Sequence, residues 1–145
     1  MLEKYKAEDS SEVQGIAEVL SYLEMKYHSL ANDYTKDGHT EHCGLIAVDI
    51  VRLFIKSGLK PQIFSIVGKV VDSAGNRETI YPRRYSNRVS WEGHTVCVLN
   101  GVVYDPMVGT PVPLDEYARI TFSKEVDMYV YIDSDEITEF VGRRK

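Results

Sequence analysis

The segment from Ser90 to Pro106 reads SWEGHTVCVLNGVVYDP. Two runs of apolar, β-branched residues flank the dipeptide Asn100-Gly101, which is typical of a two-residue hairpin turn. With these two residues as the loop, Leu99 pairs with Val102, and the pairing continues outward residue by residue. The segment therefore predicts an antiparallel β-hairpin whose register is fixed by its turn.

This register brings His94 close to Asp105. Asp105 lies opposite Val96, and Val96 shares a strand face with His94 because side chains alternate between the two faces. The two polar residues are then diagonal neighbours, roughly 7–8 Å apart at Cα and within reach of an imidazole–carboxylate hydrogen bond. The hairpin thus predicts a His94–Asp105 pair on one of its faces.

The other face of the hairpin carries Cys97, opposite Tyr104. If the face with His94 packs on the helix that begins at Cys43, Cys97 faces away from that helix. A disulfide between the two cysteines then needs a shift of register, and a cytosolic chain of this size has little need of one. We expect Cys97 to be a small, buried, apolar side chain.

The most apolar segment of the chain is residues 43–56, CGLIAVDIVRLFIK. It predicts a helix that begins near Thr40 and ends at Gly58, with Pro61 behind it. Its charged residues share one narrow stripe: Asp49, Arg52 and Lys56. Cys43 lies roughly 150° from the middle of that stripe, so we expect it in the first turn of the helix, pointing into the protein core.

The remaining elements indicate an α+β fold. Helical spacing of apolar residues predicts a first helix from Ser10-Ser11 to about Leu30, followed by a loop over residues 32–40. Strands are expected at 62–71 and 126–132, a short helix at 113–117, and an edge strand or loop at 80–88. We expect one domain over residues 1–145, helical to residue 58 and sheet-rich from residue 59, with an antiparallel sheet packed on the Cys43 helix.

Cys43, His94 and Asp105 together are suited to nucleophilic catalysis. The thiolate is the reactive form of cysteine, and both the first turn of a helix and a nearby imidazolium stabilise it. His94 supplies the imidazolium and exchanges the proton, while Asp105 fixes its tautomer and orientation. Gly93 lets a substrate backbone approach His94. Taken singly, each residue also has a structural interpretation: a buried cysteine, a strand histidine and an aspartate that caps a turn.

Three short motifs resemble the papain-like superfamily, in particular its transglutaminase-like and small bacterial cysteine-peptidase branches. They are His42-Cys43-Gly44-Leu45-Ile46-Ala47, Gly93-His94-Thr95-Val96-Cys97-Val98 and Gly101-Val102-Val103-Tyr104-Asp105-Pro106. In those families a cysteine opens a central helix, and histidine and aspartate follow on adjacent strands. The resemblance implies that Cys43 is the nucleophile, His94 the base and acid, and Asp105 the orienting residue.

The chain departs from this pattern at two positions. Gly44 stands where papain-like and many transglutaminase-like enzymes have tryptophan after the nucleophile. Asp37 stands six residues before the cysteine, where papain has a glutamine that donates to the oxyanion. The Cys43 backbone N–H is one expected oxyanion donor, and a side chain from the preceding elements supplies another. The candidates for that second donor are Gln14, Asn32 and His39.

Aromatic and basic residues cluster between the two halves of the predicted sheet. Their members are Tyr81, Arg83, Arg84, Tyr85, Arg88 and Trp91. This cluster suits either a rim that recognises substrate, with Trp91 as a contact residue, or an exposed loop of mixed composition. The segment His39-Thr40-Glu41-His42-Cys43 suggests a zinc site less well, because structural zinc ligands usually come in pairs from two segments. We therefore predict no metal and no cofactor.

Charge and composition narrow the class of protein. The formal net charge of the 145-residue chain is −5 and the basic residues are scattered, which disfavours binding to nucleic acid. No signal peptide and no apolar run of roughly 20 residues is present, so a cytoplasmic location away from membranes is expected. No glycine-rich phosphate loop occurs.

These observations favour a thiol hydrolase that acts on peptide or isopeptide bonds of a peptide or protein substrate. One alternative is a transglutaminase-type enzyme, in which an amine accepts the acyl group. Another is a catalytically silent protein-binding module on the same fold, since a fold does not determine a function.

Overall fold

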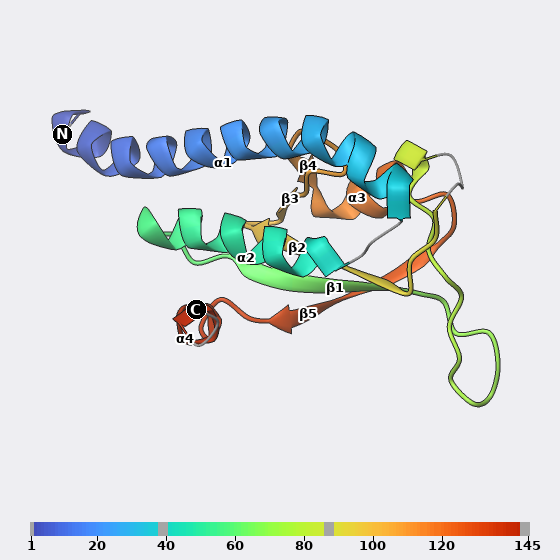
Figure 1. Cartoon of the computed structure of the whole chain (residues 1–145). Coiled ribbons are helices and arrows are strands. Elements are labelled where there is room, and N and C mark those ends of the chain that lie inside the picture. The colour runs from blue at the N-terminus through green and yellow to red at the C-terminus, as the bar shows by residue number, and fades with distance from the viewer. Residues whose placement is uncertain (1, 38–40, 86–88, 143–145) are drawn as a thin grey trace.

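The structure is a computed structural model that describes residues 2–37, 41–85 and 89–142, and of residues 2–10, 31–37, 41 and 42 only the backbone. Two helices precede the sheet: α1 (Leu2–Asp37) and α2 (Glu41–Lys56). Helix α1 lies over α2, and α2 lies over the sheet (Figure 1). Val19, Leu23 and Leu30 of α1 are buried.

Helix α1 is longer at both ends than the sequence predicted. It begins at Leu2 rather than at Ser10-Ser11, and it continues beyond Leu30 to Asp37. Neither extension contains a glycine or a proline, so nothing interrupts the helical backbone once it has formed. The predicted loop over residues 32–40 is therefore wrong for 32–37, and residues 38–40 lie outside the described part of the chain.

Helix α2 follows its prediction closely. It ends at Lys56, and Gly58 adopts a φ of 85°, the left-handed conformation that closes many helices. The charged stripe is exposed, whereas Ile50, Val51 and Phe54 are fully buried. Cys43 is the third residue of α2 and is buried, as the stripe predicted.

Five antiparallel strands form one sheet in the order β4-β3-β2-β1-β5. They are β1 (Gln62–Gly68), β2 (Gly93–Leu99), β3 (Val102–Tyr104), β4 (Val112–Pro113) and β5 (Val126–Ile132). The α+β fold class and the antiparallel sheet are thus confirmed. The two-residue strand β4 was not predicted, because it is too short to show a period.

The β2–β3 hairpin has the predicted register. Leu99 pairs with Val102, and Cys97 pairs with Tyr104. Asn100 and Gly101 have φ values of 51° and 76°. Positive φ at both loop positions is what a type I′ turn requires, and Asn-Gly meets it at little conformational cost.

Helix α2 packs on the sheet face opposite to the one expected. The Tyr104 ring lies 4.9 Å from that of Phe54 in α2, and Tyr104 stands directly opposite Cys97. Cys97 therefore faces α2 and His94 points to the other side, so the expectation that Cys97 turns away from the helix is wrong. Cys97 is nevertheless fully buried, and both cysteines are free, as predicted.

The sheet face that carries His94 is covered by the segment between β1 and β2 and by α3 (Leu114–Thr121). That segment forms the 3-10 helix η1 (Arg83–Tyr85) and pairs Ile80 with Trp91. The short helix predicted at 113–117 is confirmed, and it extends further than expected. Among the described helices, none combines the length and the apolar character needed to cross a membrane.

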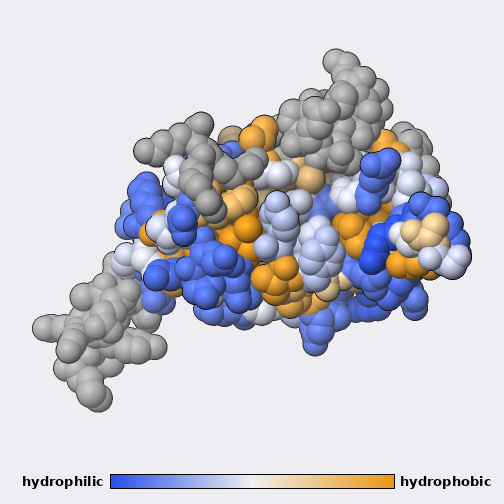
Figure 2. Space-filling view, turned by 90° about the horizontal axis from the view of Figure 1, so that it is seen from below, coloured by the Kyte–Doolittle hydropathy of each residue, from blue (hydrophilic) through white to orange (hydrophobic). Residues whose placement is uncertain are grey.

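Strand β5 forms one edge of the sheet and leads into α4 (Ile137–Gly142), a short helix that the sequence did not predict and that contacts α2. Figure 2 shows the face of the molecule opposite α1, where apolar and hydrophilic residues alternate. Tyr129, Val130 and Tyr131 of β5 are each at least 43% exposed.

Candidate active site

The hairpin brings His94 and Asp105 into direct contact. His94 is the second residue of β2, and Asp105 directly follows β3. Nε2 of His94 lies 2.9 Å from Oδ2 of Asp105, and both side chains are buried. Because an ionised carboxylate only accepts hydrogen bonds, Nε2 is the donor. The predicted His94–Asp105 pair is thus present in the structure.

The carboxylate of Asp105 is held from three sides. Besides His94, it accepts a hydrogen bond at Oδ1 from the backbone N–H of Met107, at 3.0 Å, and one at Oδ2 from the hydroxyl of Tyr117. Tyr117 is fully buried. Three donors fix the position of the carboxylate, so the direction of the histidine ring is fixed as well.

Sequence reasoning missed Tyr117 as part of this site. The one available signal is the spacing of Leu114, Tyr117 and Thr121, which places them on one side of a short helix. That spacing shows that Tyr117 turns inward, but it does not show what its hydroxyl meets. Its partner follows only from how α3 packs against the end of β3.

Cys43 approaches His94 where β2 lacks its β3 neighbour. Strand β3 pairs with β2 only from Cys97 onward, so the stretch around Thr95 has one open edge. The Thr95 backbone N–H interacts with the Cys43 thiol there. A small cavity of about 10 Å³ remains between α2 and this edge, lined among others by Cys43, His94 and Asp105. Helix α2 and strand β2 thus bring Cys43 close to the His94–Asp105 pair, although α2 lies on one side of the sheet and His94 points to the other.

The electrostatics of the site favour a thiolate–imidazolium pair. Burial alone raises the pKa of Cys43, but the hydrogen bond and charge of His94 and the N–H of Thr95 outweigh it and lower that pKa below its ordinary value. Burial alone lowers the pKa of His94, but the charge and hydrogen bond of Asp105, with help from Cys43, raise it to about 10. A thiol with a lowered pKa beside a protonated imidazole is an activated nucleophile.

The second nitrogen of the His94 ring is free to exchange a proton. Nδ1 is buried and makes no hydrogen bond of ordinary geometry with any described residue, while Nε2 is occupied by Asp105. Cys43 nevertheless interacts with the ring strongly enough to raise its pKa. Catalytic hydrogen bonds are often loose before substrate binds, so this arrangement suits proton transfer at Nδ1.

Aromatic rings enclose the imidazole of His94. The Trp91 ring stacks on it with centroids 4.9 Å apart, and Phe122 meets it edge to face at 6.0 Å. Trp91 is only 1% exposed, so it packs against the imidazole and has no free surface for a substrate. The cluster predicted as a rim is partly internal: Arg84 donates to the Tyr27 carbonyl oxygen, whereas Arg88 lies outside the described residues.

The structure describes the side chain of only one of the three candidates for the second oxyanion donor, Gln14. Gln14 lines a groove beside Lys56, which is 13 residues from Cys43, or about 20 Å along α2. The structure therefore does not support Gln14 as a donor. His39 lies outside the described residues, and so does the side chain of Asn32. The Cys43 N–H belongs to the first turn of α2 and has no partner within the helix.

Gly93 begins β2 and lies against β1. A Cβ at this position would come within 3.4 Å of the Ile66 carbonyl oxygen. That distance is an ordinary van der Waals contact, so the packing of β2 on β1 does not by itself require glycine at this position. The predicted role of Gly93 in admitting a substrate remains a prediction.

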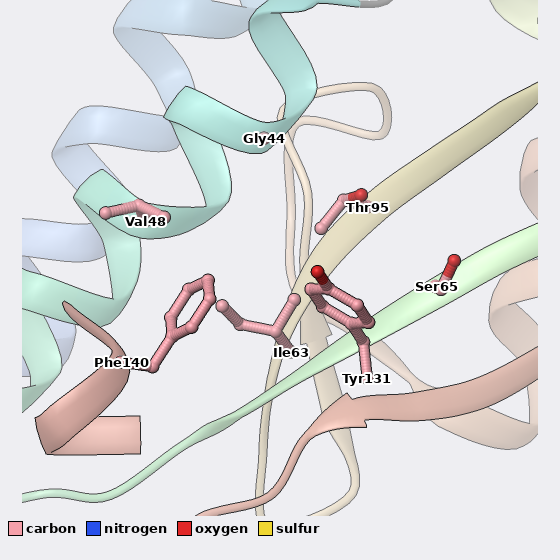
Figure 3. Close-up of a pocket in the computed structure, with 7 residues that line it drawn as sticks. All are labelled: Gly44, Val48, Ile63, Ser65, Thr95, Tyr131 and Phe140. Carbon is pink, nitrogen blue, oxygen red and sulfur yellow. The ribbon is translucent and has the colours of Figure 1, made fainter. Parts of the chain in front are cut away.

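A cleft of about 220 Å³ adjoins the site (Figure 3). It is lined by Gly44, Val48, Ile63, Ser65, Thr95, Tyr131 and Phe140. Gly44 and Thr95 directly follow Cys43 and His94, so the cleft leads away from the reactive groups. A Cβ built on Gly44 meets no atom within 4 Å. Gly44 therefore leaves open space at the position where papain-like and many transglutaminase-like enzymes have a tryptophan.

Comparison with protein-family models, with curated proteins and with solved structures yields no match for this chain. The resemblance therefore rests on the three short motifs. Among the described residues, no group of three or more His, Cys, Asp or Glu side chains is placed to bind a metal ion. His39 and the side chain of His42 are outside that search.

Proposed function

We propose that this chain is a cysteine-dependent hydrolase of the papain-like or transglutaminase-like type, acting on peptide or other amide bonds. The observation that carries the proposal is the buried Cys43–His94–Asp105 arrangement, with a lowered pKa at Cys43 and a raised pKa at His94. A buried cysteine that serves packing alone has a raised pKa, as Cys97 does in the same protein.

The first half of the reaction forms an acyl-enzyme. The Cys43 thiolate attacks the carbonyl carbon, a C–S bond forms, and the carbonyl oxygen becomes an oxyanion that the Cys43 N–H stabilises. The His94 imidazolium then donates its proton to the leaving nitrogen as the C–N bond breaks. Asp105 remains ionised and keeps the ring in place. The products of this half are an amine and a thioester on Cys43.

The second half releases the acyl group. Neutral His94 removes a proton from water as the water oxygen attacks the thioester carbonyl. The tetrahedral intermediate collapses with cleavage of the C–S bond, which yields a carboxylic acid and restores the thiolate–imidazolium pair. An amine in place of water gives amide transfer by the same steps.

The arrangement of elements supports the family assignment within this proposal. The cysteine lies in the first turn of a helix that packs on an antiparallel sheet. The histidine lies on β2 and the aspartate directly after the neighbouring β3, in the order Cys, His, Asp along the chain. These are the features that the resemblance implies. A binding module on the same fold has no need of an activated thiol.

The direct test is trapping of the acyl-enzyme. Wild-type protein is mixed with p-nitrophenyl acetate and with peptide aminomethylcoumarin amides, quenched in acid, and analysed by intact and peptide mass spectrometry. We expect an acyl adduct on Cys43 and amide hydrolysis, both lost in Cys43→Ala. Cys97→Ala is the matched control and should retain both. Equal hydrolysis by wild type and Cys43→Ala would contradict the proposal.

A further inference from the structure

None of the described residues that line the cleft beside Cys43 carries a charge. Its described lining consists of aliphatic and aromatic carbon from Val48, Ile63 and Phe140, together with the hydroxyl-bearing Ser65, Thr95 and Tyr131. A charged group that enters such a cleft gives up its hydration and finds no opposite charge. An apolar group that enters it leaves water and packs against carbon. The described lining therefore favours the binding of apolar groups over charged ones.

The size of the cleft suits one side chain. A cavity of about 150 Å³ lined by apolar residues accommodates benzene, and this cleft measures about 220 Å³. It is therefore large enough for a branched aliphatic or phenyl group and too small for a folded polypeptide segment. Gly44 contributes to this space because it has no side chain to fill it.

The position of the cleft links it to the reaction. Thr95 lines this cleft as well as the small cavity around Cys43 and His94, and its N–H interacts with the Cys43 sulfur. The cleft is therefore separated from the reactive residues by one position in each segment: Gly44 follows Cys43, and Thr95 follows His94. Figure 3 shows the side chains that define it, with Phe140 and Ile63 together below Val48 and the Tyr131 ring extending from β5.

Two elements from the end of the chain close the cleft. Tyr131 of β5 and Phe140 of α4 meet edge to face, with centroids 6.3 Å apart. Tyr131 is 59% exposed and Phe140 is half-buried, so one lies at the mouth and the other deeper. Tyr129, which pairs with the cleft-lining Ser65, is 50% exposed.

We infer that this cleft binds an uncharged, apolar side chain or acyl substituent of the substrate, of leucine or phenylalanine size, next to the bond that Cys43 attacks. The inference rests on the proposed function and specifies the substrate class of the same site. Gly44, Tyr131 and Phe140 are the residues that set this specificity.

The test uses chloroacetamides that alkylate Cys43 and differ only in the substituent on the amide nitrogen. The substituents are benzyl, isobutyl, carboxymethyl and 2-aminoethyl, and unsubstituted chloroacetamide is the reference. Each rate constant is divided by that of the same reagent with glutathione, which removes differences in intrinsic reactivity. Alkylation of Cys43 is followed by peptide mass spectrometry.

We expect the benzyl and isobutyl reagents to react with Cys43 at least about tenfold faster than the two charged reagents after this correction, because they bury apolar surface in the cleft. Gly44→Leu fills the cleft and should abolish this ratio, and Tyr131→Ala should reduce it. Leu45→Ala is the matched control: Leu45 is 60% exposed and does not line the cleft, so the ratio should persist.

The outcomes separate the inference from the function on which it rests. If unsubstituted chloroacetamide alkylates Cys43 readily but the apolar reagents show no advantage, the inference is wrong and the proposed function stands. The inference is equally wrong if the advantage survives Gly44→Leu unchanged. If no reagent alkylates Cys43 in the folded protein, the proposed function fails and the inference fails with it.

Discussion

Tyr117 donates a hydrogen bond from its hydroxyl to Oδ2 of Asp105. The same carboxylate oxygen accepts the hydrogen bond from His94, so a residue of α3 controls how the hairpin presents its histidine. Burial, followed by the charge of Asp105, raises the pKa of Tyr117 well above its ordinary value, and the phenol remains a donor throughout the physiological pH range. Tyr117 is therefore a positioning residue for the candidate site.

Tyr117→Phe should separate the structural role of this hydroxyl from the chemistry of the thiol. The substitution removes one donor to a buried carboxylate and is expected to lower the free energy of unfolding by about 1–3 kcal/mol. The Met107 N–H and His94 still hold Asp105, so Cys43 should keep its reactivity below its ordinary pKa. Urea denaturation and the pH profile of Cys43 alkylation measure the two effects. Loss of the low-pH reactivity in a variant that remains folded would contradict this expectation and show that the Tyr117 hydroxyl is needed to hold Asp105 and His94 in place.

Asp105→Asn should affect the pH profile much more strongly. The neutral amide removes the charge that, against the opposing effect of burial, holds the pKa of His94 at about 10. The His94 imidazolium should then lose its proton at a far lower pH. The thiolate–imidazolium pair should therefore exist over a narrower pH range, because the upper limit of that range falls. Titration of the His94 ring by NMR in Cys43→Ala backgrounds with and without Asp105→Asn gives this shift directly. An unchanged pKa for His94 would exclude Asp105 as its main partner.

The hairpin shows how much of the site was present in the sequence. Asn100-Gly101 determines the turn, the turn determines the register, and the register places His94 beside Asp105. The charged stripe of α2 determines that Cys43 is buried. These features are local, so turn chemistry and helical periodicity suffice to predict them.

The missed features depend on packing between distant segments. Which sheet face covers α2 is decided by contacts such as Phe54 with Tyr104, which no local pattern encodes. The partner of Tyr117 and the cleft formed by β5 and α4 likewise arise only when the end of the chain folds back onto α2. The distance of Gln14 from Cys43 likewise depends on how α1 packs along α2, which is a tertiary property.

The raised pKa of His94 predicts that stability depends on pH in a defined direction. A group whose pKa is raised on folding stabilises the fold fully below its unfolded value, here 6.5, and loses that contribution as pH rises through about 10. Cys43 acts in the opposite sense: its lowered pKa adds stability above its ordinary value of 9.0, and that contribution is lost as pH falls through the lowered pKa.

Cys43→Ala isolates the contribution of His94. In this variant the free energy of unfolding should fall above about pH 6.5 with a slope of up to about 1.4 kcal/mol per pH unit, until the folded-state pKa of His94 is reached. The wild type should show a shallower slope below pH 9. There the folded state binds one proton more at His94 but one proton fewer at Cys43 than the unfolded state, and the two differences oppose each other. Urea denaturation at several pH values compares the two. A steeper slope in the wild type than in Cys43→Ala would contradict the assignment.

The two cysteines should differ sharply in reactivity. Cys97 is fully buried, and burial raises its pKa well above the ordinary value, whereas the pKa of Cys43 is lowered. Ellman's reagent should therefore titrate one thiol in the folded protein near neutral pH and both after unfolding in guanidinium chloride. Cys43→Ala should leave no reactive thiol in the folded state. Rapid reaction of Cys97 in the folded protein would show that α2 does not protect it.

The most direct test of the account is the rate of Cys43 alkylation by iodoacetamide from about pH 4 to 10, in wild type and in His94→Ala. Urea denaturation of His94→Ala confirms that the variant is folded. The account predicts that wild-type Cys43 reacts well below its ordinary pKa and that His94→Ala abolishes this low-pH reactivity. An inert Cys43, or one that titrates like a free thiol whether or not His94 is present, would contradict the central claim that His94 activates this cysteine.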